Sequence, residues 1–318
     1  MTPERWQRIK AVFAAALASE RARRGPLVDE LCAGEPSLHA EVRSLIAAHE
    51  STSGTDWLGA RAFVPEPDFP GHARFTVESR LGAGGFGVVY RARDAVRGRA
   101  VALKILRARD AAGIVRFKRE FRALADLSHP NLVRLHELFV EDERVFFTME
   151  LCEGRPLAEA LRAARAGESP ADRRRRTAAT FEQLVDGVMA LHAERLLHRD
   201  LKPSNVLVTG DDRVVILDFG LATDLNDVGA APDAGVCGTP AYMAPEQFLA
   251  GASSAASDLY AVGVMLYETL AGRLPWEGEL GGVVDAKAKA APPRPEGSVD
   301  AAAVLGDLCV ALLAPEPA

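Results

Sequence analysis

The distribution of apolar residues changes character twice along the chain. In the first fifty residues apolar side chains recur every three or four positions, at 6, 9, 13 and 17 and again at 38, 42, 45 and 46, which predicts amphipathic helices. The pattern stops between Ser51 and Gly71, where Gly, Pro, Ser and Asp are frequent. The sequence therefore predicts three regions: a helical N-terminal module over 1–50, a linker over 51–72 and a larger domain over 73–318.

From residue 73 to about residue 150 the apolar positions alternate instead, which is typical of strands. The stretches FTVESRL, GVVYRARD and RAVALKIL predict three consecutive strands, and LVRLHELF and RVFFTMEL predict two more. Between these groups, AGIVRFKREFRALADL returns to helical spacing. We therefore expect a strand-rich block with one helix.

Helices are expected to dominate after residue 157. Helical patterns cover Leu157–Arg165, Thr180–Glu194, Ser257–Ala271 and Ala301–Leu313, and the stretches VLVT and VVILD predict a short pair of strands between them. The basic run Arg173–Arg176 could bind an acidic partner, but we interpret it as the solvent-exposed start of a helix.

Composition narrows the class of protein. With 318 residues and 48% hydrophobic residues, the chain can bury a core, and its net charge of −6 gives no reason to expect a nucleic acid partner. Its four cysteines form no CxxC pair, which indicates reduced thiols and a cytoplasmic protein. The N-terminus is not a secretory signal, and no apolar run approaches the ~18 residues of a membrane span, so no membrane segment is expected.

A glycine cluster lies between the first two predicted strands. Gly82, Gly84 and Gly87 form the pattern GxGxxG. A dinucleotide-binding fold would need a helix directly after this pattern, but a strand follows here. Glycines in such a turn allow backbone N–H groups to approach phosphates, although a plain glycine-rich hairpin would give the same sequence.

Lys104 stands inside the apolar strand Val101-Ala-Leu-Lys. An unpaired ammonium in the interior of a strand is costly, so this lysine needs an anionic partner. Glu120 on the following helix and the phosphates of a ligand are the candidates, whereas a surface lysine on an edge strand is the alternative interpretation.

Two polar motifs follow in the second half of the chain. His198-Arg-Asp-Leu-Lys-Pro-Ser-Asn205 contains Asp200, which can accept a hydroxyl proton. Asn205, together with Asp218 of the tripeptide Asp-Phe-Gly, offers the oxygen ligands that suit Mg²⁺.

The order of these motifs, closed by the stretch GTPAYMAPE, resembles the eukaryotic-type (Hanks-type) protein kinases. The resemblance runs from about Phe75 to Ala318, and HRDLKPSN and GTPAYMAPE resemble the serine/threonine branch. It implies an α+β, bilobal protein-kinase fold preceded by a short all-α segment. The β-rich N-lobe is expected over about 73–150 and the larger helical C-lobe over about 154–318.

The resemblance also implies a role for each matching residue. Asp200 would be the catalytic base, Lys202 would lie near the transferred phosphoryl group, and Lys104 would hold ATP phosphates while paired with Glu120. The two Mg²⁺ ligands would be Asn205 and Asp218. The residues expected around ATP are Leu81, Gly82, Gly84, Gly85, Phe86, Gly87, Val89, Ala102, Lys104, Met149, Glu150, Cys152 and Leu207, with Met149 as gatekeeper and the backbone of Glu150 and Cys152 as hinge.

Structural roles follow from the same resemblance. A hydrophobic stack between the lobes is expected from Leu124, Leu135, His198 and Phe219. Asp258, in the stretch SDLYAVGVMLYE, matches the helix residue that anchors the catalytic loop.

The implied activity is that of a bacterial serine/threonine protein kinase that uses Mg-ATP to phosphorylate proteins. A pseudokinase scaffold is the main alternative, and a small-molecule kinase is disfavoured because GTPAYMAPE shapes the peptide groove in protein kinases. The N-terminal module is similar to a helical leader in many bacterial kinases. The final stretch LGDLCVALLAPEPA stops before the arginine that usually pairs with Glu246, so we expect a C-terminally incomplete domain and a fragment.

The stretch from Asp218 to Glu246 would be the activation segment. Arg199 is typical of kinases in which a phosphate orders this segment, yet the segment offers only Thr223, Thr239 and Tyr242 as hydroxyls. Thr239 is better interpreted as a partner of Asp200. We therefore expect Asp227 or Asp233 to supply the anion, or ordering by the substrate alone.

Overall fold

The structure is a computed structural model, and it describes most of the chain from residue 72 onward and part of the N-terminal region. The described residues are 8–9, 11–13, 15–16, 19, 21–40, 42–43, 46, 72–84, 87–106, 111–141, 144–163, 165, 167–218, 240–249, 253–278, 280–295 and 301–315. Residues 51–71 of the predicted linker and most of the activation segment, including Phe219 and Thr239, lie outside these residues.

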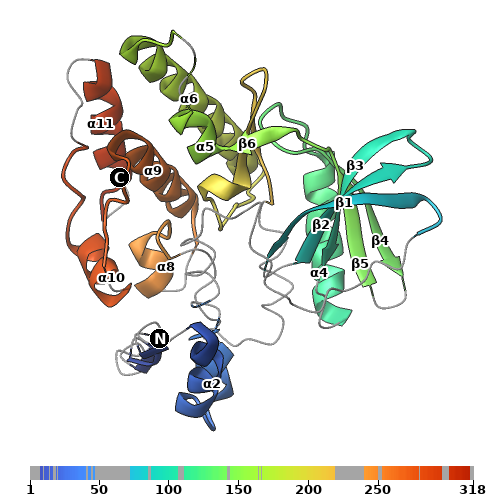
Figure 1. Ribbon diagram of the computed structural model, residues 1–318, viewed down its shortest axis with the longest axis horizontal. Helices are drawn as coiled ribbons and strands as arrows, with labels where there is room; N and C mark the ends of the chain where they lie inside the picture. Colours follow the sequence, from blue (N-terminus) through green and yellow to red (C-terminus); the bar gives the residue numbers. More distant parts are fainter. Residues whose placement is uncertain are drawn as a thin grey trace.

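An antiparallel five-stranded sheet forms one end of the molecule, with the strand order β1-β2-β3-β5-β4 (Figure 1). Its strands are β1 (Phe75–Gly84), β2 (Gly87–Asp94), β3 (Arg99–Leu106), β4 (Leu135–Glu141) and β5 (Arg144–Met149). The helix α4 (Ala111–Asp126) lies beside the sheet. All five strands were predicted from the sequence, although β3 is buried on both faces and Val77 of β1 and Val140 of β4 are exposed.

Both faces of β3 are buried, and they belong to different apolar clusters. Val101, Leu103 and Ile105 join Phe75 and Phe146 on one face of the sheet. Ala102 and Leu106 join the main core, which continues through Phe117 and Phe121 of α4 into the helical part of the molecule. Because side chains alternate along a strand, Lys104 shares its face with Ala102 and Leu106.

Helices build the other end of the molecule around a central, buried helix (Figure 1). They are α5 (Leu157–Arg162), α6 (Pro170–Ala193), α8 (Pro245–Leu249), α9 (Ala255–Ala271), α10 (Leu280–Lys289) and α11 (Ala301–Leu312). A small sheet of β6 (Gly154–Pro156), β7 (Val206–Thr209) and β8 (Val214–Ile216) lies between them and the large sheet. The fold is thus the α+β, bilobal arrangement expected from the sequence.

Three sequence-based element predictions need correction. The helix expected from Thr180 begins ten residues earlier, because Ser169 and Asp172 form a reciprocal capping box at its start. Helix α5 ends at Arg162 and not at Arg165. The short elements β6, α8 and α10 were not predicted, since three to ten residues give too little periodicity.

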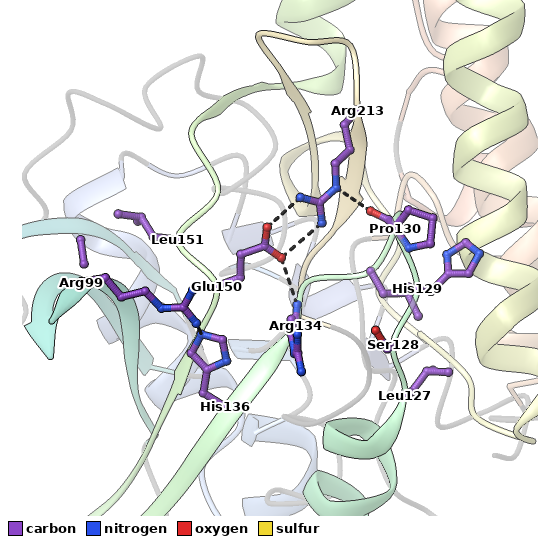
Figure 2. Close-up of a pocket in the computed structure, with 12 residues that line it drawn as sticks. Arg99, Leu127, Ser128, His129, Pro130, Arg134, His136, Glu150, Leu151 and Arg213 are labelled. Atoms are coloured by element: carbon purple, nitrogen blue, oxygen red, sulfur yellow. Dashed lines mark hydrogen bonds and ion pairs between the residues drawn. The ribbon is translucent and has the colours of Figure 1, made fainter. Parts of the chain in front are cut away.

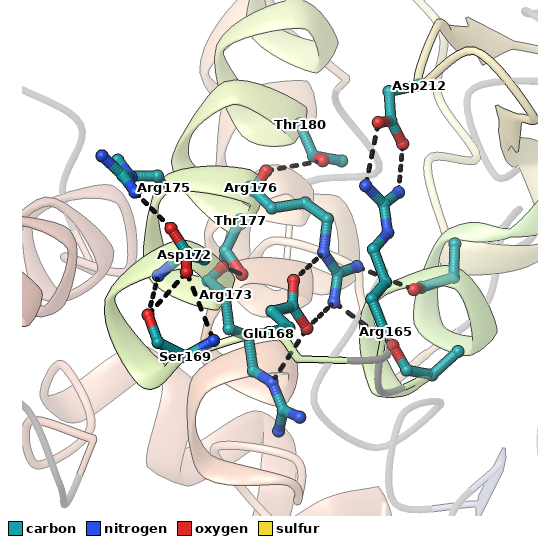
Figure 3. A network of polar contacts seen from close by, with 12 residues as sticks. Arg165, Glu168, Ser169, Asp172, Arg173, Arg175, Arg176, Thr177, Thr180 and Asp212 are labelled. Carbon is teal, nitrogen blue, oxygen red and sulfur yellow. Dashed lines mark hydrogen bonds and ion pairs between the residues drawn. The ribbon is translucent and has the colours of Figure 1, made fainter.

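The basic run at the start of α6 is only partly solvent-exposed (Figure 3). Arg175 is exposed, but the side chain of Arg176 is only 9% exposed and binds Glu168, which is 6% exposed. Arg176 also donates to the carbonyl oxygens of Ala160 and Ala163 near the end of α5. The prediction of a solvated run was therefore wrong for Arg176, which joins two helices.

The N-terminal residues share an apolar cluster with the C-lobe. Helix α2 (Arg21–Leu31) and the described residues around it are mostly helical. The cluster consists of Ile9, Val12, Phe13, Ala16, Val28, Cys32, Leu38, Val42 and Ile46 together with Met243, Phe248 and Val284. The N-terminal region therefore lies against α8 and α10, while the division of the chain at residues 50 and 72 stays a prediction.

Candidate active site

The loop from His198 to Lys202 is held by a carboxylate sixty residues further along the chain. Asp258, at the start of α9, accepts the backbone N–H groups of His198 and Arg199, each at 2.9 Å. His192 of α6 contacts the same carboxylate at 2.9 Å. Burial alone would raise the pKa of Asp258, but these hydrogen bonds and the nearby His198 outweigh burial and lower it. Asp258 therefore makes contacts of the kind expected from a residue that anchors this loop.

Arg199 has a backbone φ of 68°, a left-handed conformation that is costly for a residue with a side chain. Such strain persists only where surrounding contacts determine the conformation. The bond from Arg199 N–H to Asp258 supplies one such contact. His198 supplies another, because its Nε2 lies 2.9 Å from the Leu217 carbonyl and its Nδ1 accepts the Asp200 N–H at 3.3 Å. The conformation that presents Asp200 is therefore built into the loop.

The side chains of Asp200, Lys202 and Asn205 lie close together. Lys202 Nζ lies 2.8 Å from Asp200 Oδ2. Asn205 Nδ2 donates to the Asp200 carbonyl at 2.8 Å and lies 3.3 Å from Oδ2. The amide orientation that serves Asp200 leaves Asn205 Oδ1 as the atom suited to a cation. The structure thus brings together a base, an ammonium and an oxygen ligand.

Asp218 is joined to the N-lobe by the lysine of β3. Lys104 Nζ lies 2.6 Å from Asp218 Oδ1, and the lysine side chain is only 7% exposed. Burial acts to raise the pKa of Asp218, but the charge and hydrogen bond of Lys104 prevail, so the carboxyl pKa lies below its ordinary value. Lys104 therefore has an anionic partner, as expected, but here that partner is Asp218, which was not among the candidates. Its predicted pairing with Glu120 stays a prediction, because the Glu120 side chain lies outside the described part.

The strands that carry the predicted nucleotide-binding residues pair so that several of these residues lie directly opposite one another. In the sheet Val89 pairs with Lys104, and Ala102 pairs with Met149. At the start of β2, Gly87 has a φ of 152°, and a Cβ there would lie 1.9 Å from the Ile105 carbonyl oxygen. Only glycine fits this close approach of two backbones. Gly85 and Phe86 lie outside the described residues, so their predicted contacts with ATP remain predictions.

Glu150, one of the predicted hinge residues, connects the two lobes through its side chain (Figure 2). Its carboxylate accepts from both terminal nitrogens of Arg213, at 2.7 and 3.2 Å, and its backbone N–H donates to the Arg134 carbonyl at 2.8 Å. The Arg213 hydrogen bonds hold the pKa of Glu150 below its ordinary value despite burial. Arg213 was not identified from the sequence, because it precedes β8 in a turn with no motif of its own.

A cavity of about 520 Å³ lies on the side of the hinge where Glu150 binds Arg213. Arg99, Arg134 and His136 line it together with Glu150 and Arg213, as Figure 2 shows. It therefore lies next to the hinge residues from which adenine recognition is expected.

The comparisons with known proteins agree with this geometry. The protein kinase domain family matches residues 75–292. The serine/threonine-protein kinase PrkC of Bacillus subtilis is 36% identical over 209 residues, which are 65% of this chain and 32% of PrkC. Serine/threonine-protein kinase pkn3 of Myxococcus xanthus is 38% identical over 65% of this chain and 39% of its own length. CBL-interacting protein kinase 4 of Oryza sativa is 39% identical over 64% of this chain and 46% of its own length.

The chain therefore belongs to the protein kinase family, and it is similar to serine/threonine kinases of the Hanks type from bacteria. It spans about a third to a half of the length of these curated relatives. Membership of the family implies ATP and a divalent metal ion as the partners of the site. Among the described residues, no helix is both long and apolar enough to cross a membrane.

Proposed function

We propose that this chain is a serine/threonine protein kinase that transfers the γ-phosphoryl group of Mg-ATP to Ser or Thr hydroxyls of proteins in bacterial signalling. The observation that supports it best is the convergence of Asp200, Lys202 and Asn205 in one loop, opposite the Lys104–Asp218 ion pair. Along the chain, these residues follow one another in the order and with the spacing of the motifs that carry out phosphoryl transfer in protein kinases.

In this proposal Asp200 orients the substrate hydroxyl and accepts its proton as the phosphoryl group arrives. Lys202, which already lies beside Asp200, neutralises charge on the transferred group. Asn205 and Asp218 would hold Mg²⁺, which would supply the charge neutralisation of the phosphates. Mg²⁺ prefers oxygen ligands, and both side chains offer oxygen atoms, so the residues present fit this metal ion.

Lys104 is proposed to position the ATP phosphates from the N-lobe. Because its ammonium is bound to Asp218, the two lobes meet at the place where the phosphates would lie. Val89, Ala102 and Leu207 are proposed to enclose adenine, with Leu81 and the glycine residues above the phosphates and Met149 as gatekeeper. The backbone of Glu150 and Cys152 would hold the adenine edge.

A radiolabelled ATP assay with myelin basic protein tests the proposal. We expect Asp200→Asn to lower phosphotransfer by about 10³-fold, the usual size of a general-base contribution. Lys104→Met should also abolish transfer without unfolding the chain. The Arg175→Ala variant is the control, since its side chain is 79% exposed and pairs with Asp172 at the start of α6 (Figure 3).

The same assay distinguishes the pseudokinase alternative. A scaffold would bind nucleotide and give no labelled protein, with or without these substitutions. Full transfer by both Asp200→Asn and Lys104→Met would contradict the assignment of the catalytic residues. Replacing Mg²⁺ by other divalent ions in the wild-type assay identifies the preferred metal.

Regulation and location are proposed from chemistry alone. Asp227 or Asp233, both outside the described residues, is proposed to replace the usual activation-loop phosphate. Mass spectrometry of active enzyme should find no phosphate on Thr223 or Thr239, and a required stoichiometric phosphate there would contradict this.

The described thiols, Cys32, Cys152 and Cys309, are free, which together with the use of ATP supports a cytoplasmic location.

A further inference from the structure

Lys287 of α10 is a charged residue with no exposed surface. Its ammonium donates to three backbone carbonyl oxygens, those of Pro240 at 3.1 Å, Ala241 at 2.9 Å and Met243 at 2.7 Å. A lysine ammonium has three N–H donors, so each donor has one acceptor. No carboxylate lies within ion-pair distance of it among the described residues, which means that backbone dipoles supply the negative partners.

Aromatic rings surround the same ammonium. The ring centroids of Phe248, Tyr260 and Trp276 lie 5.8, 5.5 and 5.7 Å from Nζ. Ring faces within about 6 Å attract a cation through their quadrupole. Burial lowers the pKa of Lys287 to about 7. The carbonyls and rings act in the opposite direction, because they bind the ammonium more strongly than the neutral amine.

The three carbonyls belong to the segment that ends the predicted activation segment. Their negative ends point at one place, which is unfavourable unless a cation lies there. Two other contacts in this segment hold side chains, since Tyr242 donates to Glu268 at 2.8 Å and Glu246 accepts from Ser257 at 2.8 Å. The Ala244 N–H donates to Gln247 Oε1 at 2.9 Å just after the three carbonyls. Lys287 therefore determines the path of the backbone itself.

This backbone lies next to the catalytic loop. Asp200 and Leu201 line one small cavity together with Tyr242 and Met243. The residue before Pro240 is Thr239, the expected partner of Asp200. A movement of the Pro240–Met243 backbone would therefore change the surface on which a peptide meets Asp200, while the Lys104–Asp218 pair on the nucleotide side would stay in place.

We infer that Lys287 is a positioning residue for the protein substrate: it holds the Pro240–Met243 backbone in the shape that receives the peptide beside Asp200. The inference rests on the proposed kinase function. It assigns to α10, which touches no reacting group, a role in the affinity for protein and not in the affinity for ATP.

The test compares Lys287→Met with Lys289→Met in the full chain. Both lysines are on α10, but Lys289 is exposed and Lys287 is buried. Steady-state phosphorylation of myelin basic protein gives separate KM values for protein and for ATP. We expect Lys287→Met to raise the protein KM by about tenfold or more, the factor that corresponds to one lost charge-assisted hydrogen bond, and to leave the ATP KM unchanged.

Hydrogen exchange of the free proteins gives a readout without activity. The backbone amides of 241–249 should exchange faster in Lys287→Met than in wild type or Lys289→Met. If wild-type protein phosphorylates nothing, the proposed function fails, but the exchange result still tests the contact. The inference would be overturned if Lys287→Met had the same KM values and the same exchange rates as the wild type. It would also be overturned if the KM values for protein and for ATP rose equally.

Lys287→Arg covers the case in which Lys287→Met does not fold. This variant keeps the positive charge, but its planar guanidinium cannot direct donors at three converging carbonyls as an ammonium does. We expect a smaller rise of the protein KM, again with the ATP KM unchanged, and faster exchange in 241–249. A wild-type protein KM and wild-type exchange in Lys287→Arg would then overturn the inference.

Discussion

Arg74 joins two carboxylates at the edge of the large sheet. It donates to both oxygens of Asp94, each at 2.8 Å, and to both oxygens of Glu137 at 2.6 and 2.7 Å. The Asp94 side chain is completely buried. These hydrogen bonds lower the pKa of Asp94 to about 2 and that of Glu137 to about 2. Removing the arginine would leave a buried carboxylate without its cation.

We expect Arg74→Met to lower the free energy of unfolding by about 3 kcal/mol at pH 7. Because both folded-state pKa values are depressed, the stabilisation is present above about pH 4.5 and is lost as the pH falls toward 2. Urea unfolding of wild type and variant between pH 7 and pH 2 measures both effects. The difference should shrink below pH 4.5, and a constant difference over this range would contradict the role of the two carboxylates.

Helix α9 passes close to α11 at a glycine. A Cβ on Gly263 would lie 2.8 Å from Leu312 Cβ and 3.1 Å from Leu313 Cδ2. Alanine is usually the better helix residue by about 1 kcal/mol. Here the clash prevails, since Leu312 Cβ is next to the backbone and cannot rotate away.

Gly263→Ala should therefore destabilise the chain by about 1–3 kcal/mol, the usual cost of overpacking. The matched control is Gly282→Ala in α10, where a Cβ would meet no atom within 4 Å. That change should stabilise the chain by about 0.5–1 kcal/mol through helix propensity. Urea unfolding decides, and stabilisation by Gly263→Ala would show that the helices can separate without cost.

The whole molecule is larger than the region that the kinase family matches. Residues 8–46 contribute nine members to the apolar cluster that also contains Met243, Phe248 and Val284. Phe248 also lies beside the ammonium of Lys287. The N-terminal region thus shares one apolar core with α8 and α10.

We expect Ile9→Asp to lower the unfolding midpoint of the whole chain, because Ile9 is fully buried and an unpaired carboxylate there costs about 3 kcal/mol or more. Limited proteolysis should then cut both the N-terminal region and the segment around α8. Arg8→Ala is the neighbouring control, since its ion pair with Glu35 is exposed and contributes little. Proteolysis confined to residues 1–50 would contradict a shared core.

The residues of the proposed chemistry and most of the long elements could be predicted from the sequence. The glycine cluster, Lys104, Asp200, Asn205 and Asp218 are recognisable in one dimension, because phosphoryl transfer needs these residue types in a fixed order. The five strands and the long helices follow from periodicity, because one face of each must be buried.

Other residues that hold the proposed site in place became recognisable only in the folded structure. Arg213 binds the hinge residue Glu150, and Lys287 binds a turn 44 to 47 residues earlier, whereas the anchoring role of Asp258 was already expected from the resemblance. Local sequence gives no signal for such contacts. Lys287 binds backbone groups, which every residue carries, and both contacts depend on the folding that brings distant segments together.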